Sequence, residues 1–66
     1  MEIFVNGAAH QVPNNYSVAD LVEAMALTGK RIAVEINLDI VPRSAHTARH
    51  LQAGDRVEIV HAIGGG

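Results

Sequence analysis

The sequence ends in HAIGGG, and the carboxylate of Gly66 is the reactive group that its last three residues offer. Glycine loses more backbone entropy on ordering than any other residue, so Gly64, Gly65 and Gly66 do not stabilise a fold. A chain without Cβ atoms is thin enough to pass through a narrow channel to an activating enzyme's ATP. Once adenylated, the terminal carbonyl can accept sulfur or an amine. We therefore expect chemistry at Gly66, the alternatives being terminal fraying or a remnant of an expression sequence.

The histidines are the other candidates for chemistry. His46 and His50 are four residues apart in HTARH, a spacing that places both imidazoles on one face of a helix, where they could bind a metal ion. The motif lacks the glutamate of H-E-x-x-H and an evident third ligand, so we predict no metal site. His10 and His61 have no evident catalytic partner. Since no triad, carboxylate pair or phosphate loop can be assembled, we expect that the chain is not an enzyme by itself.

Composition narrows the possible functions further. The 66 residues carry a net charge of −2 and include no cysteine, which excludes disulfides, thiolate nucleophiles and cysteine-ligated zinc. The scattered basic residues and two aromatic residues disfavour nucleic-acid binding. No apolar stretch approaches the roughly 20 residues of a membrane span, and MEIFVNG lacks the basic start of a secretory signal. We expect a cytoplasmic protein without membrane or nucleic-acid partners.

The first half of the chain predicts a hairpin followed by a helix. Residues 1–6 alternate as a strand, the Asn6-Gly7 dipeptide is typical of a type I′ turn, and residues 8–12 return as an edge strand. Ser17 is the expected helix N-cap, with Asp20 three residues later. The helical spacing predicts one buried face and a left-handed glycine after the helix end; the residues concerned are Val18, Leu21, Val22, Met25 and, at the end, Gly29.

The second half predicts strands around a short helical segment. RIAVEINL alternates, and its pattern assigns four residues to one face: Ile32, Val34, Ile36 and Leu38. A turn at residues 37–39, a short strand at 40–41 and a helical segment or structured loop within 43–51 precede a last strand with Val57 and Ile59 inward. This order predicts an α+β, β-grasp (ubiquitin-like) fold: a mixed four- to five-stranded sheet packed on one main helix. The domain spans residues 1–63, and residues 64–66 form a flexible glycine tail.

Several stretches together resemble the ThiS family of thiamine-biosynthesis sulfur carriers, within the ubiquitin-like β-grasp superfamily. They are VNG in the first hairpin, SVADLVEAM in the helix, AVEIN and IVPRS in the middle, and GDRVEIVHAIGGG at the end. The closing segment is the most specific of them. Two departures lie in turns: VPNNY before the helix has little similarity to the family, and Leu38 stands where ThiS-like sequences often have glycine.

The resemblance implies a carrier that partner enzymes modify. A ThiF-like adenylyltransferase would use MgATP to attach AMP to the Gly66 carboxylate, and sulfur from a cysteine desulfurase pathway would then replace AMP to leave a thiocarboxylate. A ThiG-like thiazole synthase would accept that sulfur, and the chain would bind no cofactor itself. Gly64 and Gly65 would thread into the partner active sites. Val60 and Ile63 are candidates for partner docking, the alternative for Val60 being ordinary packing of the sheet.

Three other functions remain open at this point. A MoaD-like carrier for molybdopterin synthase would share the fold and the thiocarboxylate chemistry. A ubiquitin-like modifier would instead join its terminal glycine to a target lysine. A plain β-grasp interaction module would have an inert tail, and deleting Gly65 and Gly66 would leave its function intact.

Overall fold

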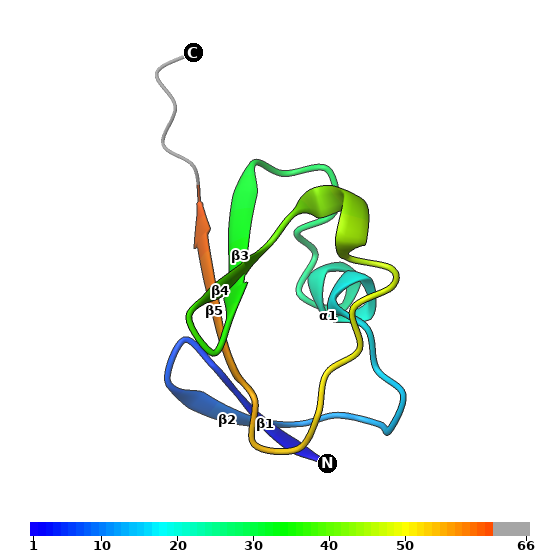
Figure 1. The fold of residues 1–66 in the computed structure, drawn as a ribbon, viewed down its shortest axis with the longest axis vertical. Helices are drawn as coiled ribbons and strands as arrows, with labels where there is room; N and C mark the ends of the chain where they lie inside the picture. Colours follow the sequence, from blue (N-terminus) through cyan, green and yellow to red (C-terminus); the bar gives the residue numbers. More distant parts are fainter. Residues whose placement is uncertain (62–66) are drawn as a thin grey trace.

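The computed structural model describes residues 1–61 as a five-stranded sheet with one α-helix on one of its faces (Figure 1). In chain order the elements are β1 (Glu2–Val5), β2 (Ala8–Gln11), α1 (Val18–Ala24), β3 (Ile32–Ile36), β4 (Asp39–Val41), the 3₁₀-helix η1 (Arg43–Ala45) and β5 (Arg56–His61). The strands lie in the order β2-β1-β5-β3-β4. β5 runs parallel to β1 and antiparallel to β3. The predicted element order and mixed sheet are confirmed, and the last strand lies at the centre of the sheet.

The β1–β2 hairpin follows the sequence pattern. Val5 pairs with Ala8, so Asn6 and Gly7 form a two-residue turn, with φ of 49° and 84°. These left-handed conformations define a type I′ turn and suit asparagine and glycine. β2 has exposed side chains along its length and lies at the sheet edge, as predicted.

The start of α1 is also as predicted. The Ser17 hydroxyl accepts a hydrogen bond from the Asp20 amide at 3.0 Å, and the Asp20 carboxylate accepts one from the Ser17 amide at 2.9 Å. This reciprocal pair is a capping box, which satisfies two backbone donors at the helix N-terminus. α1 then buries Val18, Leu21 and Val22.

The end of α1 differs from the prediction. The helix ends at Ala24 with Met25 as C-cap, so Met25 leaves the buried face and is partly exposed. Ala26 takes the left-handed position directly after the helix end, with φ of 58°, whereas Gly29 is also left-handed, as predicted, with φ of 80°, but lies in the following loop. Its amide donates to Glu23 O and the Leu27 amide donates to Val22 O, both at 2.9 Å, which is the Schellman pattern. Leu27 packs on the core and thereby fixes this early end.

The prediction that Leu38 shares the buried face of β3 is wrong. Val34 and Ile36 are buried, but the strand ends at Ile36. Asn37 and Leu38 form the two-residue turn to β4, with φ of 50° and 74°. The Leu38 side chain is 84% exposed in this turn.

The core lies between α1 and the facing side of the sheet (Figure 1). It contains branched aliphatic residues of every strand except β2, together with those of α1 and the following loops: Ile3, Val5, Val18, Leu21, Val22, Val34, Ile36, Val41, Leu51, Val57 and Ile59. Val57 and Ile59 of the central strand point into it, as predicted. Within residues 1–61, no helix is long and apolar enough to span a membrane.

Candidate docking face at the last strand

The last strand is held by β3 as far as His61 and on its other side as far as Ile59. β3 pairs with it from Ile36–Val57 to Ile32–His61, whereas β1 pairs only with Arg56 and Val57. Beyond that point the side chain of Asn6 takes the place of a neighbouring strand. Its Oδ1 accepts the Ile59 amide at 2.8 Å, and its Nδ2 donates to the Ile59 carbonyl at 3.2 Å. Asn6, the first residue of the β1–β2 turn, thus stabilises the carboxyl-terminal half of β5.

A second asparagine stabilises the beginning of β5. The Asn37 amide donates to Arg56 O at 2.8 Å, and Asn37 Oδ1 accepts the Arg56 amide at 3.0 Å. Asn37 Nδ2 also donates to Asp55 Oδ1 at 3.1 Å, while Asp55 Oδ2 accepts the Gln52 amide at 2.8 Å. β5 therefore presents its carboxyl end from a position fixed by backbone and side-chain hydrogen bonds.

The alternation of β5 divides its side chains between two faces of the sheet. Val57 and Ile59 face α1, so Arg56, Glu58 and Val60 lie on the other side, which we call the open face. Val60 pairs with Ala33 of β3 and is 52% exposed. Because half of its surface is accessible, Val60 is not part of the core, and its role in docking stays a prediction.

The other predicted site residues lie outside the described part of the chain. Ile63, Gly64, Gly65 and Gly66 follow the last described residue, His61. Their predicted roles in docking, threading and adenylation therefore stay predictions.

Two hollows flank Arg56 and Glu58 on the open face. One, of about 340 Å³, is lined also by Phe4, Gly7 and Val57. The other, of about 300 Å³, is lined also by Asn37 and Leu38. Leu38 and Ile40 were not predicted as surface residues of this face. The one signal in the sequence was leucine at a turn position where glycine is common in similar chains.

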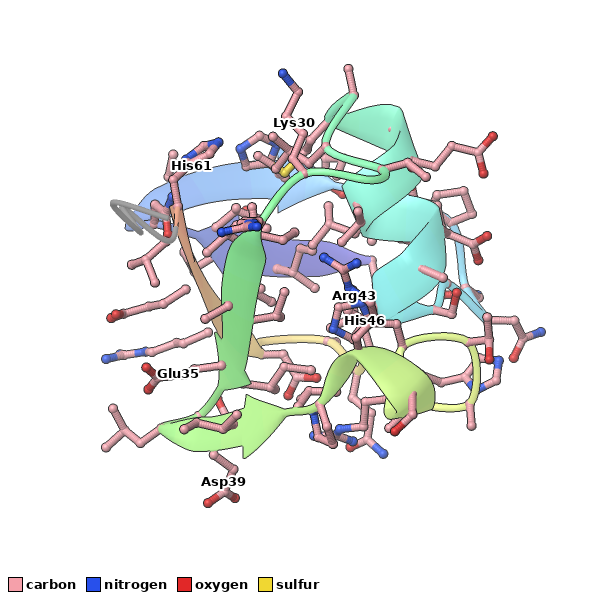
Figure 2. The ribbon with its side chains drawn as sticks, turned by 90° about the horizontal axis from the view of Figure 1, so that it is seen from above. Lys30, Glu35, Asp39, Arg43, His46 and His61 are labelled. Carbon is pink, nitrogen blue, oxygen red and sulfur yellow. The ribbon has the colours of Figure 1, made fainter. Side chains whose placement is uncertain are left out.

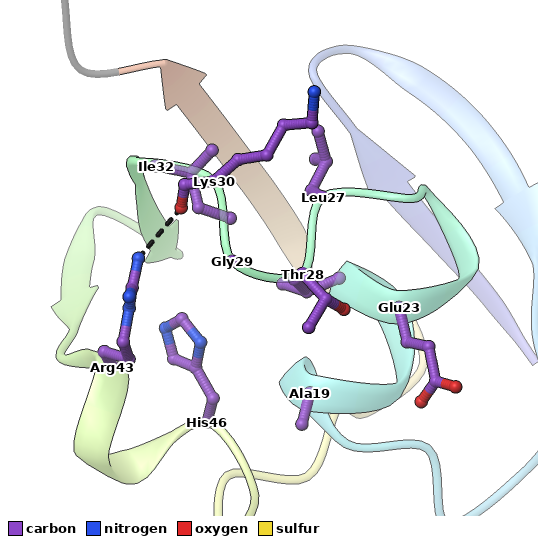
Figure 3. Close-up of a pocket in the computed structure, with 10 residues that line it drawn as sticks. Ala19, Glu23, Leu27, Thr28, Gly29, Lys30, Ile32, Arg43 and His46 are labelled. Atoms are coloured by element: carbon purple, nitrogen blue, oxygen red, sulfur yellow. Dashed lines mark hydrogen bonds between the residues drawn. The ribbon is translucent and has the colours of Figure 1, made fainter.

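A third hollow, of about 370 Å³, lies on the helix side of the sheet between α1, the 27–30 loop and η1 (Figure 3). Arg43 Nη2 closes one side by donating to the Lys30 carbonyl at 2.8 Å. His46 is buried at its floor, with Nε2 3.2 Å from the Val41 carbonyl. Because a carbonyl oxygen can only accept, Nε2 carries the hydrogen, and the bond ties η1 to β4.

Residues 46–50 are not helical, so His46 and His50 do not share a helix face, and this part of the predicted helical segment or structured loop is a loop. His50 is exposed, with Nδ1 3.2 Å from the Ala48 carbonyl. Within residues 1–61, no three metal-binding side chains gather at one place. His10 and His61 are exposed on β2 and at the end of β5.

A sheet of this order, with one helix across it and a central last strand, is a β-grasp fold. Residues 2–66 match the ThiS family, so the chain belongs to that family. In a crystal structure, the thiamine biosynthesis protein ThiS from Geobacter metallireducens aligns with a TM-score of 0.86 and 30% identity, over 100% of both chains. A solution NMR structure of a thiamine biosynthesis protein from the same organism aligns with a TM-score of 0.77 and 30% identity, over 100% of this chain and 88% of the other.

Among curated proteins, two thiazole synthases are each 35% identical to this chain over all of its 66 residues. They come from Paramagnetospirillum magneticum and Magnetococcus marinus, and the chain spans 20% of the length of each. The protein ycf40 of Porphyra purpurea, itself uncharacterized, is 29% identical over 100% of this chain and 93% of its own length. The family and the ThiS structures support a sulfur carrier in thiamine biosynthesis.

Proposed function

We propose that this chain carries sulfur as a thiocarboxylate on Gly66 for the synthesis of the thiazole part of thiamine. The observation that carries the proposal is the family match, which runs through the last residue and includes the glycines that the chemistry needs. The geometry of β5 supports it, because β3 and Asn6 hold the strand in place and thereby fix the position from which the following residues extend. In this proposal the chain is a co-substrate of other enzymes and binds no cofactor.

The proposed chemistry begins at the Gly66 carboxylate. A ThiF-like adenylyltransferase with MgATP joins the carboxylate to AMP and releases pyrophosphate, which makes the terminal carbonyl electrophilic. The persulfide that a cysteine desulfurase forms from cysteine then attacks the terminal carbonyl and displaces AMP, and a thiol reduces the resulting acyl disulfide, so that one oxygen of the carboxylate is exchanged for sulfur. Gly64 and Gly65 give the reacting end reach without side-chain bulk.

Thiazole synthase is the proposed acceptor of the sulfur. Two relatives of that name contain a segment that aligns with the whole of this chain, which supports a shared pathway. Val60 and Ile63 are the proposed docking residues for the partner enzymes. Val60 contributes an accessible apolar side chain beside the end of β5.

The intact mass of the protein tests the proposal directly. After incubation with MgATP, a ThiF-like enzyme, a cysteine desulfurase with cysteine, and a thiol reductant, the mass should rise by the difference between sulfur and oxygen. Removing Gly65 and Gly66 should abolish this change while the urea unfolding curve stays the same. An unchanged mass with an enzyme that is active on its own carrier would contradict the proposal.

The same samples separate the alternative functions. Transfer of the sulfur to thiazole synthase supports the proposal, whereas transfer only to the large molybdopterin synthase subunit would indicate a MoaD-like carrier. An AMP adduct that forms without sulfur, together with higher-mass conjugates that resist thiols and hydroxylamine, would indicate a protein modifier.

A further inference from the structure

Two carboxylates of like charge face each other in the middle of the open face. Glu35 of β3 is directly opposite Glu58 of β5 in the antiparallel register. Directly opposed residues have Cβ atoms about 4.5–5.5 Å apart, and like charges at such positions are destabilising. Glu35 is half-buried and points away from α1, toward the open side of the sheet (Figure 2). The isolated protein thus keeps an unfavourable pair where neutral residues would suit the sheet better.

The surrounding charges compensate this pair only in part. Arg56 lies on the same face, two residues before Glu58, so the three side chains together carry a charge of −1. The next basic residue along β3 is Arg31, four residues before Glu35 and about 13 Å away in extended backbone. Within residues 1–61, the carboxylates that accept hydrogen bonds are those of Glu2, Asp20 and Asp55. One negative charge on the face therefore lacks a counterpart.

Apolar side chains border the carboxylate pair on three sides. Ile40 of β4 is opposite Glu35 in the register and is 72% exposed. Leu38 lines the hollow beside Arg56 and Glu58, and Val60 is the next residue of β5 on this face. Apolar surface around a charge becomes useful when a partner covers it, because exclusion of water strengthens the electrostatic attraction.

We propose that the open face docks a protein surface that places an arginine between Glu35 and Glu58 and apolar side chains on Leu38, Ile40 and Val60. A guanidinium has donors on two edges, so it can bond both carboxylates at once and remove their mutual repulsion. The inference rests on the proposed function, since the adenylating enzyme is the partner used to test it.

Charge argues against two other occupants of the open face. A second copy of this chain, face to face, would bring the Glu35–Glu58 pairs of both copies together and increase the repulsion. A nucleic acid would present phosphates to the same carboxylates. A partner with a basic centre is the occupant that the residues of this face favour.

The test uses Glu35→Gln and Glu58→Gln, singly and together, in steady-state adenylation by the ThiF-like enzyme. The double variant should raise the KM for the carrier by about tenfold while kcat stays the same, because the change affects docking and leaves the reacting carboxylate untouched. Its urea midpoint should be equal to or above that of the unmodified protein, because a repulsive pair has been removed. If Glu35 and Glu58 had only a structural role, the substitutions would lower the urea midpoint and raise the KM together.

Glu23→Gln is the matched control. It removes the same charge from the exposed surface of α1, on the other side of the sheet, and should leave KM unchanged. An unchanged KM in the double variant, or an equal rise in the control, would overturn the inference while leaving the proposed function intact. Lack of adenylation of the unmodified protein would contradict the proposed function itself. A dimer of the unmodified protein that dissociates on Leu38→Asp substitution would also overturn the inference, by showing a second copy on this face.

Discussion

Leu38 adopts a φ of 74° in the β3–β4 turn while 84% of its side chain remains exposed. A non-glycine residue in this left-handed region loses about 1–2 kcal/mol to the contact of Cβ with its own backbone. Asn37, the other turn residue, tolerates the left-handed conformation better than leucine does, and its side chain bonds the Arg56 amide and the Asp55 carboxylate. The chain thus keeps a strained apolar residue on the open face, where burial in the fold provides no compensation.

Replacing Leu38 with glycine should stabilise the protein. Relief of the strain exceeds the greater entropy of glycine in the unfolded chain, so we expect the free energy of unfolding to rise by about 0.5–1 kcal/mol, measured by urea denaturation. Leu38→Ala is the control, because it removes the same exposed side chain but keeps a Cβ in the left-handed turn. Its free energy of unfolding should change by less than about 0.5 kcal/mol. Equal effects of the two substitutions would argue against backbone strain at this residue.

The beginning of α1 is predictable from the sequence because its signal is local. Ser17 and Asp20 are three residues apart, and both bond backbone amides of the same turn. The end of the helix depends on Leu27, which packs on a core assembled from distant strands. A sequence pattern shows neither that packing nor the resulting left-handed Ala26, so the expected end at Gly29 comes too late.

The two hairpin turns also show that a local sequence pattern does not fix where an element ends when distant contacts decide it. Asn6-Gly7 is recognisable because both residues favour positive φ. A turn is also predicted at residues 37–39, but Leu38 continues the apolar alternation of β3, so the pattern wrongly places it on the buried face. Periodicity alone cannot show that the strand ends at Ile36. The pairing of Asn37 with Arg56 and Asp55, which fixes that end, joins residues 18 and 19 positions apart.

The capping box makes the stability of α1 depend on pH. The hydrogen bond from the Ser17 backbone amide, assisted by the Ser17 hydroxyl and by the charge of His50, lowers the pKa of the Asp20 carboxyl below its ordinary value. A lowered pKa in the folded state means that the ionised carboxylate stabilises the fold above its unfolded pKa of about 4. This contribution is lost as the pH falls below the unfolded pKa and through the lowered pKa of the folded state.

Comparison with Asp20→Asn isolates this contribution. The asparagine variant cannot titrate at residue 20, while the other carboxyls titrate in both proteins. The difference in free energy of unfolding between the two proteins should be constant from neutral pH down to about pH 5 and should shrink below it. Urea denaturation at a series of pH values measures it. A difference that stays constant to pH 2 would show that the charge of Asp20 does not contribute.

At the scale of the whole molecule, the two faces of the sheet have different roles. The face toward α1 was predictable, because alternation and the helical period both identify residues such as Val34 and Val22 as buried. The pairing of Glu35 with Glu58 was not, because the register that brings them together joins strands that are distant in the chain. Composition gives the net charge of −2 but does not show where on the surface it gathers.

The same substitution at Ile36 and at Ile40, on opposite faces of one hairpin, tests whether the two faces of the sheet have different roles. Ile36 of β3 is 0% exposed in the core, while Ile40 of β4 is 72% exposed on the open face. Ile36→Ala leaves a cavity and should lower the free energy of unfolding by about 2–5 kcal/mol, a large part of the roughly 3–10 kcal/mol expected for a domain of this size. Ile40→Ala should lower it by less than about 0.5 kcal/mol.

In folded protein, Ile40→Ala should impair adenylation more than Ile36→Ala does, which is the reverse of their effects on stability. Ile40→Ala removes apolar contact from the proposed docking face, so the KM for adenylation should rise by a few fold with kcat unchanged. Ile36→Ala leaves that face intact, so its folded fraction, measured from the unfolding curve, should account for any loss of activity. A KM that is unchanged by Ile40→Ala would show that β4 lies outside the surface that the enzyme contacts, and docking would then depend on β5 and the residues that follow it.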